Sequence, residues 1–467
     1  MGTLANSTGS DFLNWNWDNL FLVKKSFSGG HNLSGTLGMT MSGNYRHVVY
    51  NEGWWLDQDG AGTASISNAD PLYSTFKYTE TAYQLLSFYA RAVYSWKDRY
   101  VLTATVRADG SSHFQGKNKW GVFPSFAFAW RINEERWFNV PAISQMKLRV
   151  GWGLVGNQKM SSYATIPTFS SVRVADHSVG SESHSQVGVF LDGIANPDLR
   201  WETTDQANVG LDMGFFKGRL SFSLDFYNKL TKDLLQQKQI ARSSGFSTMW
   251  VNQGTIRNRG FEFSFNAVPV KTGEVEWTVG GNISVNRNRI TAIGQDLQSG
   301  EIYLSPDNKQ EVNYFWGSTL RASTSSIAIL NIFIEGQPLG QFYGLKSAGI
   351  VQQGEDWPGF GDGNKAAPGD VKYLDINGNG CIDDDDRTII GDPNPDFTFG
   401  FNTSLTWKGL TLTADFNGSF GNDIYNNNLS ADLATNVSSS STLVNNIRAD
   451  AYRNAWSPLN QIGRAHV

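Results

Sequence analysis

Cysteine is almost absent from this sequence, and the one that occurs, Cys381, can form neither an intrachain disulfide nor a cysteine-based zinc cluster. Long apolar runs are absent as well. The densest stretch, 327–334, is too short for a membrane-spanning helix and is interrupted by Asn331. The first residues lack the basic segment and the apolar core of a signal peptide. These absences exclude a disulfide scaffold and a helical membrane protein, but membrane-spanning strands stay possible.

Catalytic and nucleic-acid signals are also missing. The six histidines form neither an HExxH nor an HxH pair, and there is no GxSxG and no GxxxxGK[ST] phosphate loop. A formal net charge of −5 provides no basic face for nucleic acid. We therefore expect a protein that is not an enzyme and that has no nucleic-acid partner.

Glycine is abundant, with 48 residues, and aromatic side chains make up 13% of the sequence, whereas charged residues make up only 17%. Many segments alternate between apolar and polar residues. In 99–107, Tyr100, Leu102, Ala104 and Val106 alternate with a polar row that only Val101 interrupts. A period of two places one face of a β-strand in apolar surroundings and the other face in polar surroundings.

This alternation recurs along the chain and predicts about twelve strands, each near the ten or so residues with which a tilted strand crosses a bilayer. Short turns join several of these strands, whereas longer connections, which we expect to be irregular, separate others. The clearest further strands are 145–152, 206–215, 219–227, 259–268, 275–286, 397–407 and 410–417. The short turns are 97–98, 217–218, 271–273 and 408–409, and the long connections are roughly 43–84, 109–118, 155–203, 229–256 and 293–396.

Short turns at one end and long loops at the other are typical of an outer-membrane barrel. A soluble sandwich would bury the charges of the polar row at high cost, whereas a lumen filled with water or protein would solvate or pair them. We therefore predict an all-β fold, a transmembrane antiparallel β-barrel. The charged residues of the row are Arg91, Arg107, Arg131, Lys147, Arg149, Asp212, Asp225, Glu262 and Glu276.

Aromatic residues cluster at the short turns. Trp96 and Tyr100 flank one turn, Phe215 and Phe216 precede another, and Trp407 precedes a third. Their rings suit the headgroup level, which predicts a girdle at the periplasmic side of the membrane. The alternative is that they are ordinary cross-strand pairs of an antiparallel sheet.

Several stretches, in their number and their order, resemble the barrel of SusC-like (RagA-like) TonB-dependent transporters. They are RYVLTATVRADGSS (99–112), WGVFPS (120–125), LRVGWGLVGNQ (148–158), NPDLRWETT (196–204), DFYN (225–228) with TKDLL (231–235), GQPLGQFYG (336–344), and GDVKYLDINGNG (369–380) followed by RTIIGDP (387–393). The resemblance implies a barrel of about 22 strands around an N-terminal plug.

The resemblance also implies TonB-dependent import of oligosaccharides, or less often peptides, across the cell outer membrane. A SusD-like surface lipoprotein would cover the outer mouth, outer-membrane lipid would surround the barrel, and the TonB complex would act through the plug. We find no plug and no TonB box here. We therefore expect 1–461 to be part of a barrel from the C-terminal half of a longer protein, with Met1 an internal methionine, and 462–467 (IGRAHV) to be a non-native tail.

The segment DINGNGCIDDDD, residues 375–386, has the spacing of an EF-hand calcium loop, with glycine at the required turn and aspartate at the last ligand position. Its flanks read as extended, so we expect a loop on the outer side of the barrel that calcium would pin. The alternative is a turn cluster that caps its own backbone without metal. The candidate ligands are Asp375, Asn377, Asn379, Cys381 through its backbone carbonyl, Asp383 and Asp386.

Two aromatic segments, 51–56 and 312–317, could stack on sugar rings, but packing of loop against loop is the plainer interpretation. A second function stays open at this point: a secreted, calcium-stabilised β protein that binds glycans without transport. The apolar row of 219–227 separates the two, because a transporter turns it toward lipid and a sandwich buries it against a second sheet.

Overall fold

A computed structural model of the chain describes residues 4–54, 75–175, 185–294, 298–317, 319–321, 327–426 and 457. Strands dominate these ranges, and the helices among them are short 3₁₀ turns such as η3 (Gly116–Lys119) and η7 (Asp384–Asp386). Among the described residues there is no helix of the length and apolarity needed to span a bilayer. The predicted tail at 462–467 lies outside these ranges.

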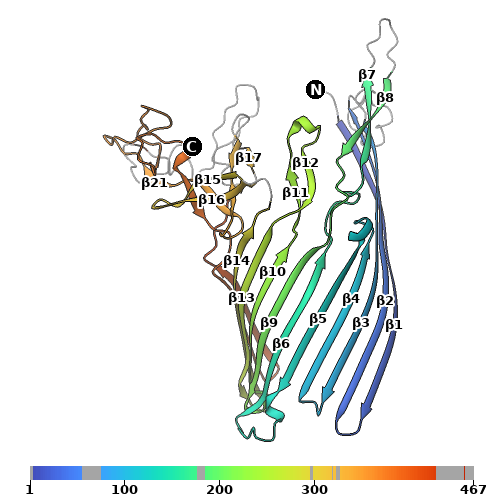
Figure 1. Ribbon diagram of the computed structural model, residues 1–467. Helices are drawn as coiled ribbons and strands as arrows, with labels where there is room; N and C mark the ends of the chain where they lie inside the picture. The colour runs from blue at the N-terminus through green and yellow to red at the C-terminus, as the bar shows by residue number, and fades with distance from the viewer. Residues whose placement is uncertain are drawn as a thin grey trace. The chain divides into compact units, whose positions relative to one another are not determined.

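Twelve strands form one large antiparallel sheet, in which each is hydrogen-bonded to the next in chain order (Figure 1). This confirms the predicted fold class. Most strands run further than the alternation predicted; β14, for example, continues to Ala292. The twelve are β1 (Leu4–Phe27), β2 (His31–Trp54), β3 (Thr75–Trp96), β4 (Tyr100–Ser111), β5 (Trp120–Arg131), β6 (Ile143–Asn157), β9 (Glu202–Phe215), β10 (Leu220–Lys232), β13 (Thr255–Lys271), β14 (Val275–Ala292), β24 (Phe397–Trp407) and β25 (Leu410–Phe420).

The strand registers place residues of like character side by side. Val106 pairs with Ala90 on one neighbour and with Pro124 on the other, while the adjacent Thr105 pairs with Arg91 and Ser125. Each of β3, β4 and β5 therefore contributes one row to an apolar face and one row to a polar face. Large side chains of the apolar face stay open; Phe126 is 53% exposed and Leu412 is 68% exposed, as expected of a surface that lipid covers.

Charges of the polar face pair with one another across strands. Arg149 on β6 donates two hydrogen bonds to Asp212 on β9, at 2.8 and 2.9 Å. Lys147 lies 3.7 Å from the same carboxylate. This pairing removes much of the cost of holding charges on a sheet face.

The chain divides into two compact units, Met1–Asp212 with Lys229–Gln253 and Met213–Asn228 with Gly254–Val467. In the first unit the long connections carry two hairpins, so the predicted irregular stretches at 155–203 and 229–256 are corrected. These hairpins are β7 (Thr168–Ala175) with β8 (Ser185–Gly193), and β11 (Leu235–Gln239) with β12 (Thr248–Asn252).

In the second unit the connection 293–396 was predicted to be irregular, but it contains a small closed barrel of five strands. Ile302, Ile332, Ile334 and Tyr343 form its buried core. The pairing depends on contacts far apart in sequence, which a local pattern does not report. The strands are β15 (Gln298–Ser305), β16 (Asn308–Trp316), β19 (Asn331–Ile334), β20 (Gln341–Leu345) and β23 (Arg387–Gly391); the pairs β17 (Thr319–Arg321) with β18 (Ile327–Ile329) and β21 (Ser347–Ile350) with β22 (Val371–Tyr373) lie beside them in the sequence.

At one of the turns the aromatic residues form the cross-strand pair that was the alternative interpretation, and the girdle stays a prediction. Trp96 and Tyr100 are a cross-strand pair whose rings stack at 5.6 Å, and Trp96 is still 38% exposed. Phe216 and Trp407 are more than half exposed. Of the predicted sugar-stacking segments, 312–317 packs within the small barrel, where the rings of Phe315 and Phe333 stack at 4.5 Å; residues 55–56 lie outside the described ranges.

Candidate functional site: a polar pocket and a calcium-type loop

A pocket of about 460 Å³ opens in the first unit, where the polar face meets the long connections. Its polar lining comes from three strands and the segment that follows β6, and an aromatic side chain, Trp201, closes one side. The polar lining residues are Thr105, Arg107, Asp109, Ser125, Asn157 and Gln158.

Arg107 is the cation of this pocket, and its neighbours hold it in place. Its guanidinium donates from Nε to Asp109 at 2.7 Å and from Nη2 to Ser87 at 2.9 Å. Asp109 and Ser87 are buried. The ion pair is therefore internally balanced, and the other polar groups that line the pocket are neutral.

A buried aromatic core forms behind the pocket. Trp201 contacts Phe114 and Phe123, with ring centroids 5.2 and 5.4 Å apart, and Leu199 is fully buried beside them. The indole N–H of Trp201 donates to the carbonyl of Lys119 at 3.3 Å. This core joins the segment after β4, the segment before β9 and the β11–β12 hairpin, so the pocket has a rigid wall.

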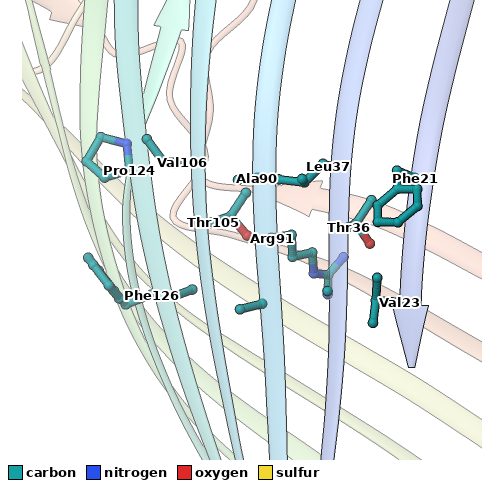
Figure 2. A pocket seen from close by; sticks show the side chains of 13 residues that line it. Phe21, Val23, Thr36, Leu37, Ala90, Arg91, Thr105, Val106, Pro124 and Phe126 are labelled. Carbon is teal, nitrogen blue, oxygen red and sulfur yellow. The ribbon is translucent and has the colours of Figure 1, made fainter. Parts of the chain in front are cut away.

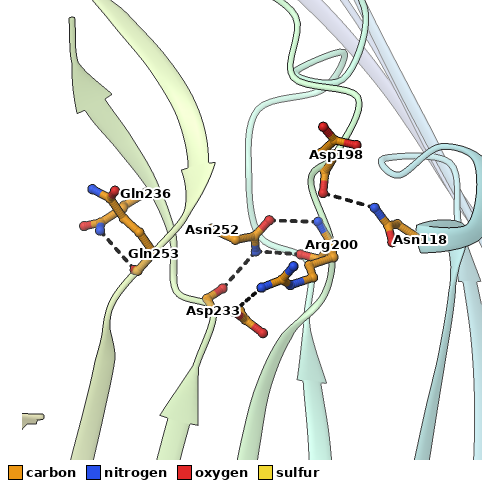
Figure 3. A network of polar contacts seen from close by, with 7 residues as sticks. All are labelled: Asn118, Asp198, Arg200, Asp233, Gln236, Asn252 and Gln253. Carbon is orange, nitrogen blue, oxygen red and sulfur yellow. Dashed lines mark hydrogen bonds and ion pairs between the residues drawn. The ribbon is translucent and has the colours of Figure 1, made fainter. Parts of the chain in front are cut away.

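A polar network fastens the β11–β12 hairpin next to this core, as Figure 3 shows. The side chain of Asn252 accepts a hydrogen bond from the backbone N–H of Arg200 and donates to its carbonyl, each at 2.8 Å. It also donates to the carbonyl of Asp233 at 2.9 Å. The guanidinium of Arg200 completes the network with an ion pair to the carboxylate of Asp233 at 2.6 Å. One asparagine thus ties three chain segments together.

His113 lies at the edge of the pocket region. Its Nδ1 is 3.2 Å from the carbonyl of Gln158, and its Nε2 is buried without a hydrogen-bond partner among the described residues. Burial lowers the pKa of His113, while the contact with Gln158 opposes the shift. The imidazole is therefore neutral at pH 7.

The candidate calcium ligands lie together in one loop of the second unit, between β22 and β23. Their side-chain oxygens accept hydrogen bonds from the loop backbone: Asp375 from Gly378 at 2.7 Å, and Asp386 from Ile376 at 2.7 Å. Asp383 caps η7 by accepting from Asp385. Among the described residues no three His, Cys, Asp or Glu side chains converge as a metal site, and calcium binding stays a prediction.

The chemistry of this loop nevertheless fits a hard cation. Asp386 is fully buried, and no Lys or Arg of the described ranges forms an ion pair with it. Asn377 and Asn379 each accept one backbone N–H through Oδ1, which leaves a free lone pair on each oxygen. Burial raises the pKa of the Cys381 thiol to about 11, so only its carbonyl is a candidate. The donor set is all oxygen, as calcium prefers.

A sheet with these two faces, short turns at one end and long connections at the other is the wall of an outer-membrane barrel. The chain belongs to the TonB dependent receptor-like, beta-barrel family, whose model matches residues 2–457. It is therefore a protein of the outer membrane, and its family is one of transport receptors rather than of enzymes.

Curated relatives agree with this family. TonB-dependent receptor P3 of Formosa agariphila is 34% identical over 452 residues, which are 95% of this chain and 41% of the relative. TonB-dependent receptor P26 of the same organism is 30% identical, covering 88% of this chain and 39% of the relative. TonB-dependent receptor SusC of Bacteroides thetaiotaomicron is 33% identical, covering 79% of this chain and 34% of the relative. The chain thus spans about two fifths of the length of the first two.

Among solved structures, the RagAB peptide transporter matches with a TM-score of 0.75 at 22% identity, covering 99% of this chain and 47% of that chain. This likeness concerns the fold. The family membership does not favour the alternative of a secreted glycan-binding protein.

The pocket of the first unit was not predicted from the sequence. Apart from Leu85, its lining residues lie in 99–112, 120–125, 148–158 and 196–204, all quoted above for their resemblance to the family. That clustering of family-like segments was the available signal, but only the fold brings them around one cavity.

Proposed function

We propose that this chain forms part of the wall of a TonB-dependent outer-membrane transporter that imports a neutral oligosaccharide. The observation that carries the proposal is the polar pocket at the loop end of the sheet, in a chain of this family. A transporter needs hydrogen-bonding groups on the surface along which its substrate passes, and the polar face supplies them.

The chemistry of the pocket favours an uncharged, polyhydroxylated substrate. Ser125, Asn157 and Gln158 offer neutral donors and acceptors, and the one cation, Arg107, is already paired with Asp109. Trp201 adds an aromatic side to the cavity. A peptide would bring charged ends, for which this pocket offers no free counter-charge among the residues that line it.

We propose in addition that a SusD-like surface lipoprotein covers the outer mouth and that the TonB complex drives import through a plug elsewhere in the full-length protein. The support is similarity to SusC and to the RagAB transporter. Affinity purification of the full-length protein from its own outer membrane tests the partnership. Recovery of one stoichiometric surface lipoprotein supports it, and recovery of the receptor alone contradicts it.

The import proposal is tested in cells that lack the gene and are complemented with the full-length protein. Uptake of labelled oligosaccharides and of labelled peptides is measured for wild type, for Ser125→Leu, which fills the pocket, and for Phe128→Leu on the opposite face. We expect oligosaccharide uptake to fall at least tenfold in Ser125→Leu and to persist in Phe128→Leu, at equal surface levels. Uptake of peptides alone would show that the substrate is a peptide and not an oligosaccharide. Absence of gene-dependent uptake of either would overturn the import proposal.

We also propose that the loop 375–386 binds calcium through its side-chain oxygens and the Cys381 carbonyl, which would neutralise the buried Asp386 carboxylate. Limited proteolysis with calcium or with chelator tests this. We expect calcium to protect the loop in wild type and in the control Asp384→Ala, whose side chain is exposed, but not in Asp375→Ala or Asp386→Ala. Equal cleavage of wild type with and without calcium would contradict calcium binding by this loop.

A further inference from the structure

The apolar face of the first unit is interrupted by a group of small residues. On this face Ala90 pairs with Leu37, and in the next row Ala92 pairs with Gly35 on β2 and with Ala104 on β4. The small residues Gly35, Ala90, Ala92 and Ala104 are therefore neighbours, in a face otherwise made of large side chains. The face therefore has a depression where they meet.

Larger side chains surround the depression. Phe21 and Val23 on β1 lie at one side, and Pro124 and Phe126 on β5 lie at the other, as Figure 2 shows. Further toward the loop end, the rings of Phe88 and Trp120 stack with their centroids 6.1 Å apart. The result is an apolar groove of about 530 Å³, within the roughly 300–1,000 Å³ typical of small-molecule sites.

The strand register fixes the depth of this groove. Ala92 lies four residues before Trp96 on β3, and Ala104 lies four residues after Tyr100 on β4. At about 3.3 Å per residue, the groove lies roughly 13 Å along the strands from the aromatic level at the turns. The hydrocarbon core is about 30 Å thick and the short turns of such barrels face the periplasm, so the groove lies at acyl-chain depth in the periplasmic leaflet.

Cationic groups stand at the aromatic level below the groove. Lys25 is two residues beyond Val23 on the same face of β1, and its ammonium lies 5.1 Å from the centre of the Phe27 ring. The ammonium of Lys97, in the turn between β3 and β4, lies 5.1 Å from the centre of the Trp96 ring. Two exposed ammonium groups at this height are placed to meet a lipid phosphate.

We propose that this groove is a specific seat for a phospholipid of the periplasmic leaflet, with one acyl chain in the groove and the phosphate near Lys25 and Lys97. The groove is apolar, so a polar solute gains nothing there, and the face is the one that meets lipid. The depth matches an acyl chain whose headgroup lies at the aromatic girdle. Because the groove is on the opposite face from the polar pocket, this inference does not depend on which substrate is transported.

Native mass spectrometry of the full-length protein, purified in mild detergent with added phosphatidylglycerol, measures retention of the lipid. The double variant Ala92→Leu/Ala104→Leu fills the groove, and Ala207→Leu is the control on the same kind of row of β9. Gly35→Val is a second filling variant, because a Cβ at Gly35 meets no atom within 4 Å. Heat-modifiable gel mobility identifies the folded barrel for every variant.

We expect wild type and Ala207→Leu to retain one phosphatidylglycerol, and both filling variants to bind it at least tenfold more weakly while folded. Lys25→Gln/Lys97→Gln should weaken retention severalfold with the groove intact. Equal retention in wild type and both filling variants would overturn the seat. Conversion of an oligomer to a monomer by the filling variants, without loss of lipid, would show instead that the groove is a contact between copies.

Discussion

Arginine at Phe226 should destabilise the barrel far more than arginine at Phe216, although both phenylalanines are exposed apolar residues near one hairpin. Phe226 is on the apolar row of β10 and is 53% exposed; Phe216 lies in the turn before β10 and is 60% exposed. In water, two such positions would tolerate arginine about equally. In a bilayer they differ because one lies at the middle and the other at the rim.

The depth of Phe226 in the bilayer follows from its position along β10. Phe226 is six residues beyond Leu220, where β10 begins, which is about 20 Å along the strand at roughly 3.3 Å per residue. With a tilt of about 40°, this is about 15 Å along the membrane normal, near the centre of a hydrocarbon layer of about 30 Å. Arginine costs about 2–4 kcal/mol at the midplane and about 0–1 kcal/mol near the interface.

Alanine variants separate this cost from lost packing, because the ring of Phe226 lies 5.3 Å from that of Phe261. The assay is equilibrium folding of the full-length protein from urea into phospholipid vesicles, read by the mobility of the folded barrel. Relative to alanine, we expect Phe226→Arg to lower the folding free energy by about 2–4 kcal/mol and Phe216→Arg by at most about 1 kcal/mol. Equal costs at the two positions would refute a lipid-facing row.

Three smaller effects follow from the loop contacts. Asn252→Ala removes the side chain that joins Arg200 to the hairpin, so hydrogen exchange in 235–252 should speed up by a factor that corresponds to about 1–3 kcal/mol, and unchanged exchange would contradict the clamp. Because burial lowers the pKa of His113, the stability that is present above pH 6.5 should fall as the pH drops below that value. Hydrogen exchange in 113–118 should therefore become faster at low pH in wild type, and this acceleration should be absent in His113→Phe. Because its pKa is raised to about 11, Cys381 should react with iodoacetamide at pH 8 roughly a hundredfold more slowly than an ordinary thiol, and rapid labelling of folded protein would contradict its burial.

The strands and their two faces were predictable because they are local properties. Side chains alternate across a strand with a period of two, so the spacing of Leu220, Phe222 and Leu224 predicts that they share one face, whatever the neighbouring strands are. The turns were equally local: Lys97 and Lys408 adopt positive φ in short connections that the sequence placed correctly. Family-like stretches then gave the family, because their order along the chain is itself sequence information.

The small barrel was missed because its strands are short and its closure is not local. Tyr303 pairs with Thr388, and the hydroxyl of Thr388 donates to the Tyr303 carbonyl at 3.0 Å across 85 residues. No pattern within β15 or β23 states that the two will meet. Closure depends on burying the core around Ile332 and Ile334, a gain that exists only after every strand is in place.

The candidate sites divide in the same way. The sequence by itself determined the spacing of the calcium-type loop, because its ligands are neighbours in the chain, and it determined which strand faces are apolar. Only the tertiary structure decided that Arg107, Asn157 and Trp201 share one cavity, and that Gly35, Ala92 and Ala104 share one groove. Their meeting depends on the registers between strands, and a shift of one residue in any register would turn each side chain to the other face.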